Sequence, residues 1–342
     1  MTEAPRMAVD IVLVGAGPVG LYGAYYAGFR GLTCAVIDSL PALGGQVTAL
    51  YPEKVLYDIA GLPEVRGRDL VDALAKQAAP FSPAYLLGQQ AEKLEPHLVG
   101  ADERLLVTTA AGLEVSCRAV VITGGIGTFT PRELPCGSAY EGRGLRYFVP
   151  SPADLAGLDV VVVGGGDSAV DWALALEHLA RSVTLVHRRA RFRAAAHSFA
   201  LLEASSVDVL VEAEVVALTG ESTVEQAHVQ VRLEEARRLV PAQAVVAALG
   251  FHAQLGPLEH WGLELQDRAI VVDSRMETCR PMVFAAGDIA TYDGKVKLIA
   301  VGFGEVATAV NNAAARLQPD IGLAPGHSSD APPATSSLEM QP

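Results

Sequence analysis

Short runs of apolar, β-branched residues recur along the chain, and segments of helical composition separate them. Ile11–Val14 has the length and residue types of a buried parallel strand, and a stretch of small residues that favours a helix follows it. Comparable runs occupy Thr33–Ile37, Ala119–Thr123 and Leu158–Val163. Strands of this kind, alternating with helices, predict an α/β fold.

The chain between these runs is less regular. A long excursion that contains several glycines runs from Leu43 to Gly61. Two interpretations are open: the excursion carries ligand contacts, or it is a covering loop. Gly67–Ala79 has the pattern of an amphipathic helix, and the proline-rich stretch Thr128–Ala156 predicts an extended linker. A β-meander inserted between them is predicted from turn-bounded runs at Tyr85–Gly88, Ala91–Leu94, Leu105–Thr109 and Glu114–Cys117.

The second half repeats the alternation of strands and helices. A helix is expected after Leu158–Val163, ending near Ala180, and the helix Gly304–Leu317 should follow a buried strand at Val283–Ile289. Further strands are predicted at Val183–Val186, Val207–Val211, Val215–Leu218, Val229–Leu233 and Val245–Leu249. After Pro325 the composition cannot bury a core, so the tail from about residue 330 is expected to be disordered.

The joint after Ile11–Val14 carries a dinucleotide fingerprint. Gly15, Gly17 and Gly20 form G-x-G-x-x-G between a strand and a helix. The first glycine permits a tight turn, the second lets backbone N–H groups approach a pyrophosphate, and the third lets the helix pack on the strand. Asp38 ends the next strand, where a carboxylate can accept from both hydroxyls of a ribose.

A second copy of this joint follows Leu158–Val163. It reads G-x-G-x-x-A, and its candidate nucleotide-binding residues are Gly164, Gly166, Asp167, Ser168 and Ala169. Glycine-rich joints also occur where no nucleotide binds. Two such joints in one chain are harder to attribute to chance, so the repetition favours two nucleotide sites.

The two copies differ at the end of the following strand. The second strand ends in His187-Arg188-Arg189 rather than in a carboxylate, and Arg193 could add a further donor. Guanidinium groups there can pair with a ribose 2′-phosphate, so this site is predicted to bind NADP rather than NAD. The alternative is a solvated basic face.

Composition narrows the class of protein. With 342 residues, of which 50% are apolar and 33 are glycine, the chain is expected to form two compact domains. The net charge of −13 argues against binding to nucleic acid or to an anionic membrane surface. A local exception is Arg181–Arg193, which is rich in arginine and contains no carboxylate.

Two stretches bear on location and metal binding. Ile11–Phe29 has no charge and is long enough to span a bilayer, but its glycines and Pro18 fit the fingerprint better. The stretch before it lacks the layout of a secretion signal, so a cytoplasmic protein is expected. No metal site is predicted, because the chain has no C-x-x-C and no ligand-like pairing of cysteine with histidine. The cysteines are Cys34, Cys117, Cys136 and Cys279, which we expect to be small buried hydrophobic residues.

Taken together, these residues resemble the flavoprotein pyridine nucleotide-disulfide oxidoreductase superfamily, and in particular its low-molecular-weight thioredoxin reductase branch. The resemblance implies two Rossmann-like three-layer domains. An FAD domain would comprise residues 1–128 and 252–342, with an NADPH domain at 129–251 inserted in it. The matching motifs are Gly15–Gly20, Asp38, Gly44-Gly45-Gln46, Ala286-Gly287-Asp288, Gly164–Ala169 and His187-Arg188-Arg189.

Thioredoxin reductases of this branch carry a redox C-x-x-C shortly before the second fingerprint, where this chain reads Tyr147-Phe148-Val149-Pro150. The chain is more similar to the thioredoxin-reductase-like ferredoxin–NADP⁺ reductases, which lack that dithiol. The motifs that carry this closer resemblance are Leu50–Lys54, Tyr57-Asp58, Gly127–Arg132, Gly164–Ala169 and Pro325–Ser329.

This resemblance implies roles for individual residues. FAD, bound tightly and without a covalent bond, would contact Gly15, Gly17, Gly20, Asp38, Gln46, Tyr51, Ala91, Phe129, Asp288 and Ser329. Asp38 would hold the adenosine ribose, and the backbone of Ala91 would contact the adenine. Gln46 and Tyr51 would contact the flavin end, and Phe129 would border the ring. Asp288 would contact the ribitol, and Ser329 would lie close to the isoalloxazine. Tyr51 and His327 would stack on opposite ring faces. NADPH would contact Gly164, Gly166, Asp167, Ser168, Ala169, Arg188, Arg189 and Arg193.

The implied activity is electron transfer between NADPH and ferredoxin. NADPH would give hydride to flavin N5, and single electrons would then pass to two ferredoxins, with no acid–base residue required. Because Tyr51 or His327 would cover a ring face where the nicotinamide should stack, some displacement or domain rotation would have to precede transfer. The resemblance also implies a homodimer whose C-terminal segment covers the flavin.

Other functions remain open at this point. The acceptor could be flavodoxin, a quinone, an Fe(III) complex, oxygen or a disulfide. A protein of another class, a non-catalytic flavin-binding redox sensor, would carry the same fingerprints.

Overall fold

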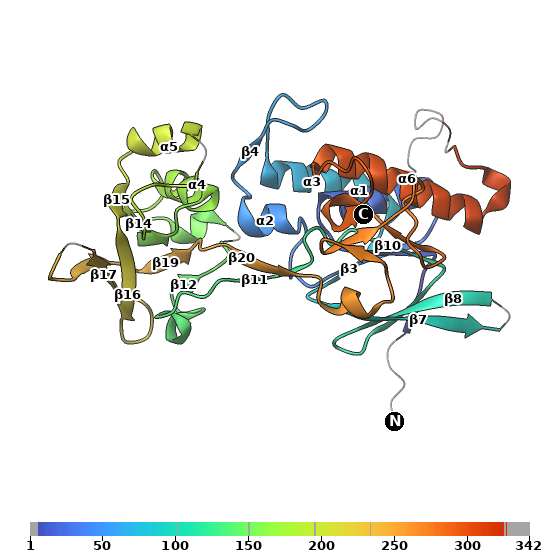
Figure 1. Ribbon diagram of the computed structural model, residues 1–342, viewed down its shortest axis with the longest axis horizontal. Coiled ribbons are helices and arrows are strands. Elements are labelled where there is room, and N and C mark those ends of the chain that lie inside the picture. The colour runs from blue at the N-terminus through green and yellow to red at the C-terminus, as the bar shows by residue number, and fades with distance from the viewer. Residues whose placement is uncertain are drawn as a thin grey trace, which may run out of the picture. The chain divides into compact units, whose positions relative to one another are not determined.

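The computed structural model describes residues 6–100, 102–149, 151–194, 196–232, 234–324 and 326, and it divides into two compact units (Figure 1). The first unit contains residues 1–48, 55–128 and 253–342, and the second contains residues 49–54 and 129–252. The second unit is thus inserted in the first. The predicted boundaries placed residues 49–54 in the first unit, whereas in the structure this segment clusters with the second.

The first unit is built on a parallel sheet of order β23-β10-β2-β3-β6. Its strands are β2 (Ile11–Val14), β3 (Cys34–Asp38), β6 (Ala84–Leu87), β10 (Ala119–Ile122) and β23 (Val283–Ala285). The apolar runs predicted as buried strands form the centre of the sheet, and β2 and β10 pair in register from Ile11–Ala119 to Val14–Ile122. Apolar side chains on both faces are expected where helices cover a parallel sheet. The predicted α/β class is confirmed.

Three long helices pack together in the first unit. They are α1 (Pro18–Phe29), α3 (Gly67–Ala78) and α6 (Ile299–Leu317), and the short α2 (Gln46–Leu50) lies in the excursion. The predicted start of α6 at Gly304 was wrong, because the helix includes Gly302. A Cβ at Gly302 would lie 2.5 Å from Val19 Cγ2 on α1, so this glycine allows close helix packing rather than ending the helix.

A second sheet in this unit is the meander of β7 (Ala91–Val99), β8 (Asp102–Thr109) and β9 (Glu114–Cys117), with β1 (Arg6–Ala8) parallel to β9. The predicted first strand of the meander, Tyr85–Gly88, belongs instead to the parallel sheet as β6, where Ala84 pairs with Ala35 of β3. Smaller sheets join β4 (Val55–Leu56) to β5 (Val65–Arg66), and β21 (Leu265–Gln266) to β22 (Ala269–Val271) and β24 (Ala290–Thr291).

The second unit repeats the parallel arrangement with order β12-β19-β13-β14-β15. These strands are β12 (Leu145–Arg146), β19 (Ala244–Ala247), β13 (Asp159–Val163), β14 (Ser182–His187) and β15 (Asp208–Val211); the helices are α4 (Asp167–Leu176) and α5 (Ala196–Glu203). An antiparallel sheet joins β16 (Ala213–Thr219), β17 (Gln226–Val231) and β18 (Arg238–Pro241).

Two expectations for the second unit were wrong. The region predicted as an extended linker contributes β12 to the parallel sheet, because Leu145 and Arg146 pair with Val245 and Val246. Helix α4 ends at Leu176 rather than near Ala180, and the turns that follow are closed by backbone bonds back to Leu174 and Leu176.

Two strands at the junctions between units pair with each other. They are β11 (Thr128–Pro131) and β20 (Phe251–Gln254). Gly127, just before β11, has φ +87°, and a Cβ there would lie 2.2 Å from Gln254 O. Glycine is therefore required at this close approach of two backbones.

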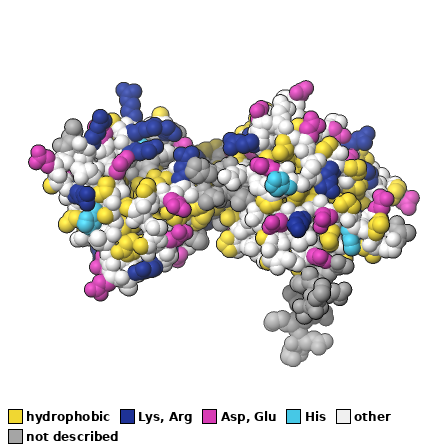
Figure 2. Space-filling view, turned by 60° about the horizontal axis from the view of Figure 1, so that its bottom comes forward, with side chains coloured by type: hydrophobic (Ala, Val, Ile, Leu, Met, Phe, Trp, Pro, Cys, Tyr) yellow, Lys and Arg dark blue, Asp and Glu magenta, His cyan; other side chains and the backbone are white. Residues whose placement is uncertain are grey.

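The surface and the cysteines add two observations. Basic and acidic side chains both occur on the face shown in Figure 2, and no helix in the described ranges is long and apolar enough to cross a membrane. Cys34 and Cys117 are buried as predicted, and burial raises the pKa of each thiol to about 12. Cys279 is exposed and Cys136 is half-buried, so burial was predicted wrongly for Cys279.

Candidate functional site

The first fingerprint joins β2 to α1, and its glycines have different surroundings. A Cβ at Gly20 would lie 1.9 Å from Gly15 O, and a Cβ at Gly15 would lie 2.5 Å from Thr123 O. Both positions are therefore closed to larger residues by backbone atoms. Gly17 faces open space, with no atom within 4 Å of an added Cβ. The turn is thus tightly packed at Gly15 and Gly20 and open at Gly17, which fits the close approach of a pyrophosphate.

The amino end of α1 is free to attract an anion. Its N-cap is Gly17, which has no side chain to accept from the first N–H groups, and the first turn contains no acidic residue. Unsatisfied N–H groups and the positive end of the helix dipole favour negative charge at this point.

Asp38 lies at the end of β3 and faces this turn. Its Oδ2 accepts from the N–H of Ala16 at 2.6 Å, and its Oδ1 accepts from the N–H of Leu40 at 2.8 Å. Burial raises the pKa of Asp38, and the two backbone donors act in the opposite direction. A carboxylate has about four acceptor positions, so two remain for ribose hydroxyls.

Other predicted FAD residues meet around the same turn. The N–H of Gly44 donates to Ala16 O at 2.8 Å, and a Cβ at Gly45 would lie 3.0 Å from the Cα of Gly17. The amide of Gln46 lies against Gly125, where an added Cβ would be 2.4 Å from its Nε2.

Asp288 and Ala91 reach this region from other strands. Asp288 follows β23 in a 3-10 helix, and the preceding Gly287 packs on Val19 of α1. Ala91 begins β7, two residues after Gln89, whose N–H donates to Asp38 O at 2.9 Å. Residues from five separate segments of the first unit thus gather at the carboxyl edge of its parallel sheet.

Four of the predicted contacts are not placed in this cluster. Tyr51 lies in the segment that clusters with the second unit. The side chain of Phe129 lies outside the described residues, as do His327 and Ser329.

The second fingerprint joins β13 to α4. A Cβ at Gly164 would lie 2.4 Å from Ala248 O, whereas nothing lies within 4 Å of one at Gly166. Ala169 is fully buried against the strand, as predicted for the third position. Unlike α1, α4 has an acidic residue, Asp167, in its first turn, while Ser168 beside it is half-buried.

The arginines that follow β14 are exposed and close to this turn. The N–H of Arg193 donates to Gly165 O at 2.8 Å, which ties the arginine segment to the fingerprint loop. Within the described ranges, the side chains of Arg188, Arg189 and Arg193 make no ion pair with a carboxylate. Three guanidinium groups are therefore available to an anionic ligand.

The side chain of His187 packs between the fingerprint loop and this arginine segment. Its ring lies against Gly165, where a Cβ would be 2.0 Å from Cε1, and its Nε2 lies 3.1 Å from Arg191 O. Burial lowers the pKa of His187, and the neighbouring arginines act in the same direction. The imidazole is thus neutral at physiological pH, with a structural role beneath the loop.

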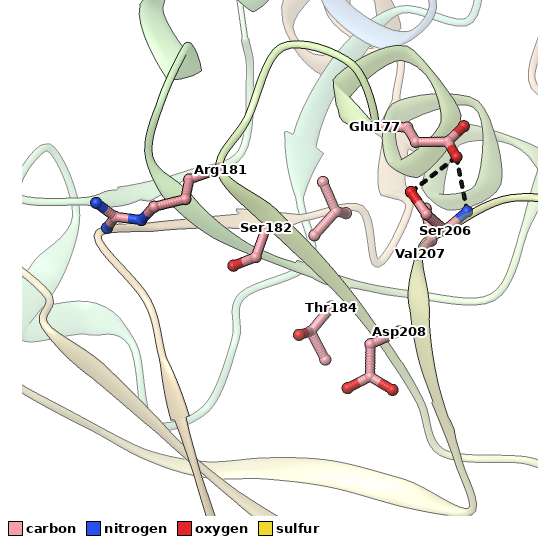
Figure 3. A pocket seen from close by; sticks show the side chains of 8 residues that line it. Glu177, Arg181, Ser182, Thr184, Ser206, Val207 and Asp208 are labelled. Atoms are coloured by element: carbon pink, nitrogen blue, oxygen red, sulfur yellow. Dashed lines mark hydrogen bonds between the residues drawn. The ribbon is translucent and has the colours of Figure 1, made fainter.

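A cavity of about 330 Å³ in the second unit lies away from this fingerprint (Figure 3). Its lining includes Ser182 and Asp208, which begin β14 and β15, so it opens at the amino edge of the sheet. Two of its three charged side chains already have partners. Arg181 pairs with Asp159 at 2.5 Å. Glu177 accepts from the backbone N–H and the hydroxyl of Ser206 (Figure 3). The cavity is not the nucleotide site.

Two contributors to these sites were not predicted from the sequence. Thr123 donates its hydroxyl to Gly15 O at 2.8 Å, and no local pattern marked it. Glu305 is a carboxylate only 5% exposed, whose oxygen accepts from the N–H of Gly287. The signal for Glu305 was available, since it is the sole charge in the apolar first half of α6.

The chain is similar to known proteins over nearly its whole length. Residues 9–313 match the family model described as pyridine nucleotide-disulphide oxidoreductase. The "Ferredoxin--NADP reductase" of Salinispora tropica is 60% identical over 94% of this chain and 98% of its own. The protein of the same name from Frankia alni is 61% identical over 93% of this chain and 98% of its own.

Solved structures show the same fold. The thioredoxin reductase of T. acidophilum has a TM-score of 0.70 at 24% identity and covers 91% of this chain and 99% of its own. That of Lactococcus lactis has a TM-score of 0.67 at 21% identity, with coverages of 89% and 97%. The chain therefore belongs to the pyridine nucleotide-disulphide oxidoreductase family and, within it, to the group of its ferredoxin–NADP reductase relatives.

Proposed function

We propose that this chain is a flavin-dependent oxidoreductase that transfers electrons between NADPH and ferredoxin. The first unit would bind FAD and the second NADPH. The observation that carries this assignment is the difference between the strand ends beside the two fingerprints. A carboxylate, Asp38, faces the first turn, whereas exposed arginines without an ion-pair partner in the described ranges adjoin the second. Relatives at 60% identity carry the name of this activity.

In the first unit, the residues would bind and orient the cofactor. The open face of Gly17 and the uncapped end of α1 suit the pyrophosphate, and the free acceptor positions of Asp38 suit the ribose. Gln46 and Asp288 reach the same sheet edge, where they would hold the flavin end and the ribitol. When bound, FAD would supply the chemistry that accepts a hydride and releases single electrons.

In the second unit, the arginines would select the nicotinamide cofactor. Arg188, Arg189 and Arg193 are exposed, and the N–H of Arg193 joins their segment to Gly165 of the fingerprint loop. A 2′-phosphate at this turn would meet their guanidinium groups. Charge-assisted hydrogen bonds of this kind are the main source of preference for NADPH over NADH.

The sequence also bears on the acceptor. The chain has four cysteines, none of them in a C-x-x-C, and the residues before the second fingerprint contain no dithiol. A disulfide relay would need such a pair. We therefore propose that the acceptor takes its electrons directly from the flavin.

The decisive experiment is cytochrome c reduction by the purified protein and NADPH, with and without added ferredoxin. We expect reduction to depend on ferredoxin. Equal rates in its absence would instead point to a small acceptor such as a quinone or an Fe(III) complex. A flavin that stays oxidised under anaerobic NADPH would contradict the enzyme assignment and favour a sensor.

We also propose a homodimer, in keeping with the family resemblance. Light scattering during size-exclusion chromatography should give twice the mass of 35.8 kDa. A monomer that remains fully active would contradict this proposal.

A further inference from the structure

A buried ion pair lies in the first unit, at the amino-terminal half of α6. Glu305 and Lys295 have side chains that are 5% and 6% exposed. The Lys295 Nζ lies 2.5 Å from Oε1 and 2.6 Å from Oε2 of Glu305, so both carboxylate oxygens share the ammonium group.

Two further donors complete the surroundings of Glu305. The backbone N–H of Gly287 donates to Oε2 at 2.7 Å, and the hydroxyl of Tyr292 donates to Oε1 at 2.7 Å. That hydrogen bond raises the pKa of Tyr292 to about 12, so the phenol remains a donor at neutral pH. The carboxylate uses its full accepting capacity on three residues of the segment 287–295.

Stability alone gives little reason for this arrangement. A buried ion pair loses as much by desolvation as it gains by attraction, and a well-packed apolar pair often serves a fold equally well. What the pair adds is fixed geometry and a local charge of zero.

The position of the pair indicates what it holds. Gly287 has φ +81° and directly precedes Asp288. Both Gly287 and Gly302 of α6 pack on Val19, which is two residues from Gly17 of the first fingerprint. The ion pair therefore ties the Gly287-Asp288 turn to the first turns of α6, at the edge of the proposed FAD site.

We propose that the Lys295–Glu305 pair positions the Gly287-Asp288 turn for FAD and sets the reduction potential of the flavin; this inference rests on the proposed function. Glu305 fixes the turn through the N–H of Gly287. Its negative charge would oppose a reduced, anionic flavin near the amino end of α6. Lys295 cancels that charge, so the positive end of the helix remains effective.

Removing the charge of Glu305 and removing the charge of Lys295 should therefore shift the flavin midpoint potential in opposite directions. Glu305→Gln leaves the Lys295 ammonium uncompensated, which favours the anionic reduced flavin and should raise the midpoint. Lys295→Met leaves the Glu305 carboxylate uncompensated and should lower it. A pair with only a structural role would weaken FAD binding in both variants without separating their potentials.

The double variant Glu305→Gln, Lys295→Met tests the two parts separately. It contains no lone buried charge, so it should fold even if a single variant does not. We expect its midpoint to return to that of the wild type. FAD should bind about tenfold more weakly, because the neutral amide that replaces the Glu305 carboxylate accepts the Gly287 N–H less strongly than a charged group does.

A matched control is the exposed pair of Glu234 and Arg238 in the second unit. Glu234→Gln removes a paired carboxylate there and should change neither FAD affinity nor midpoint. The measurements are titration of the apoprotein with FAD and spectroelectrochemistry of the reconstituted protein.

The outcomes separate this inference from the proposed function. Equal midpoint potentials in the two single variants, or shifts of the same sign, would overturn this inference. The proposed function would still stand if the wild-type protein reduces ferredoxin. If the single variants do not fold, FAD affinity of the double variant equal to that of the wild type would overturn it. A wild type that takes up no FAD would overturn both.

Discussion

The two fingerprint turns of this protein have the same backbone design and opposite charge. In each, the first glycine packs on a backbone carbonyl, Thr123 O for Gly15 and Ala248 O for Gly164, and the middle glycine faces open space. They differ in what adjoins the turn. The first has a half-buried carboxylate at the next strand end, and the second has exposed arginines. The fold thus repeats one backbone arrangement, and the proposed choice of nucleotide at each turn rests on a few side chains at the strand ends.

The third fingerprint position also differs. Gly20 comes so close to Gly15 O that a Cβ would lie 1.9 Å away, whereas position 169 accommodates the Cβ of alanine in a fully buried setting. The helix of the first unit therefore approaches its loop more closely than the helix of the second.

The largest expected effect tests this difference in helix approach. Gly20→Ala should destabilise the first unit by about 3 kcal/mol and abolish FAD binding, because the clash is with backbone and cannot relax by rotation of a side chain. Ala169→Gly is the matched control and should cost only about 1 kcal/mol through helix propensity. Thermal unfolding and the flavin content after purification measure both. A Gly20→Ala protein with full flavin content would show that the two turns are equivalent.

The next effect tests the charge difference. Replacement of Arg188 and Arg189 by alanine should weaken NADPH binding by about 100-fold or more, because each charged hydrogen bond contributes about 1.5–3 kcal/mol. Binding of NADH should change little. Arg181→Ala is the control, since Arg181 lies at the opposite edge of the same sheet and pairs with Asp159. Stopped-flow reduction with each nucleotide gives the values, and an equal loss for NADH would refute the assignment.

A smaller effect is expected from the support beneath the arginine segment. His187→Ala should weaken NADP⁺ binding by about fivefold, because the ring that packs on Gly165 and contacts Arg191 O is lost. Burial lowers the pKa of His187 below its ordinary 6.5, so the ring is neutral at pH 7 and above. The deficit measured by titration should therefore be the same at pH 7 and pH 8. A deficit that changes between them would indicate a charged imidazole.

The smallest effect compares two aspartates in the absence of ligands. The Arg181 hydrogen bond lowers the pKa of Asp159, so its stabilisation is present above pH 3.8 and is lost as the pH falls through the lower folded pKa. Burial raises the pKa of Asp38, so the native state binds that proton more tightly than the unfolded chain, and acidification favours it.

Urea unfolding of the apoprotein at pH 7 and at about pH 3 should reveal these opposite signs. On acidification, the advantage of the wild type over Asp159→Asn should shrink. Relative to Asp38→Asn, the wild type should gain. Changes of the same sign for both variants would mean that the two carboxylates have equivalent surroundings.

Much of the parallel framework could be predicted from local sequence. The apolar run at Ile11–Val14 forms a strand with those bounds, and Gly67–Ala79 differs from α3 by one residue. Outside the parallel sheet, the turn-bounded run Glu114–Cys117 also forms a strand with the predicted bounds. These segments are buried on both faces or have a clear period, so composition alone indicates their structure. Predictions failed where tertiary contacts decide. Leu145 and Arg146 are strand residues only because β19 pairs with them, and Gly302 is helical because α1 packs against it.

The sequence by itself determined the two nucleotide joints, the difference in charge between them and the lack of a redox dithiol, because each depends on residue identity over a short span. Only the tertiary structure decided which segments gather at the first turn, how His187 supports the arginines, and that Glu305 is buried with Lys295. Those features depend on contacts between different elements of the fold, and whether a buried charge is tolerated depends on donors that only the folded arrangement brings to it.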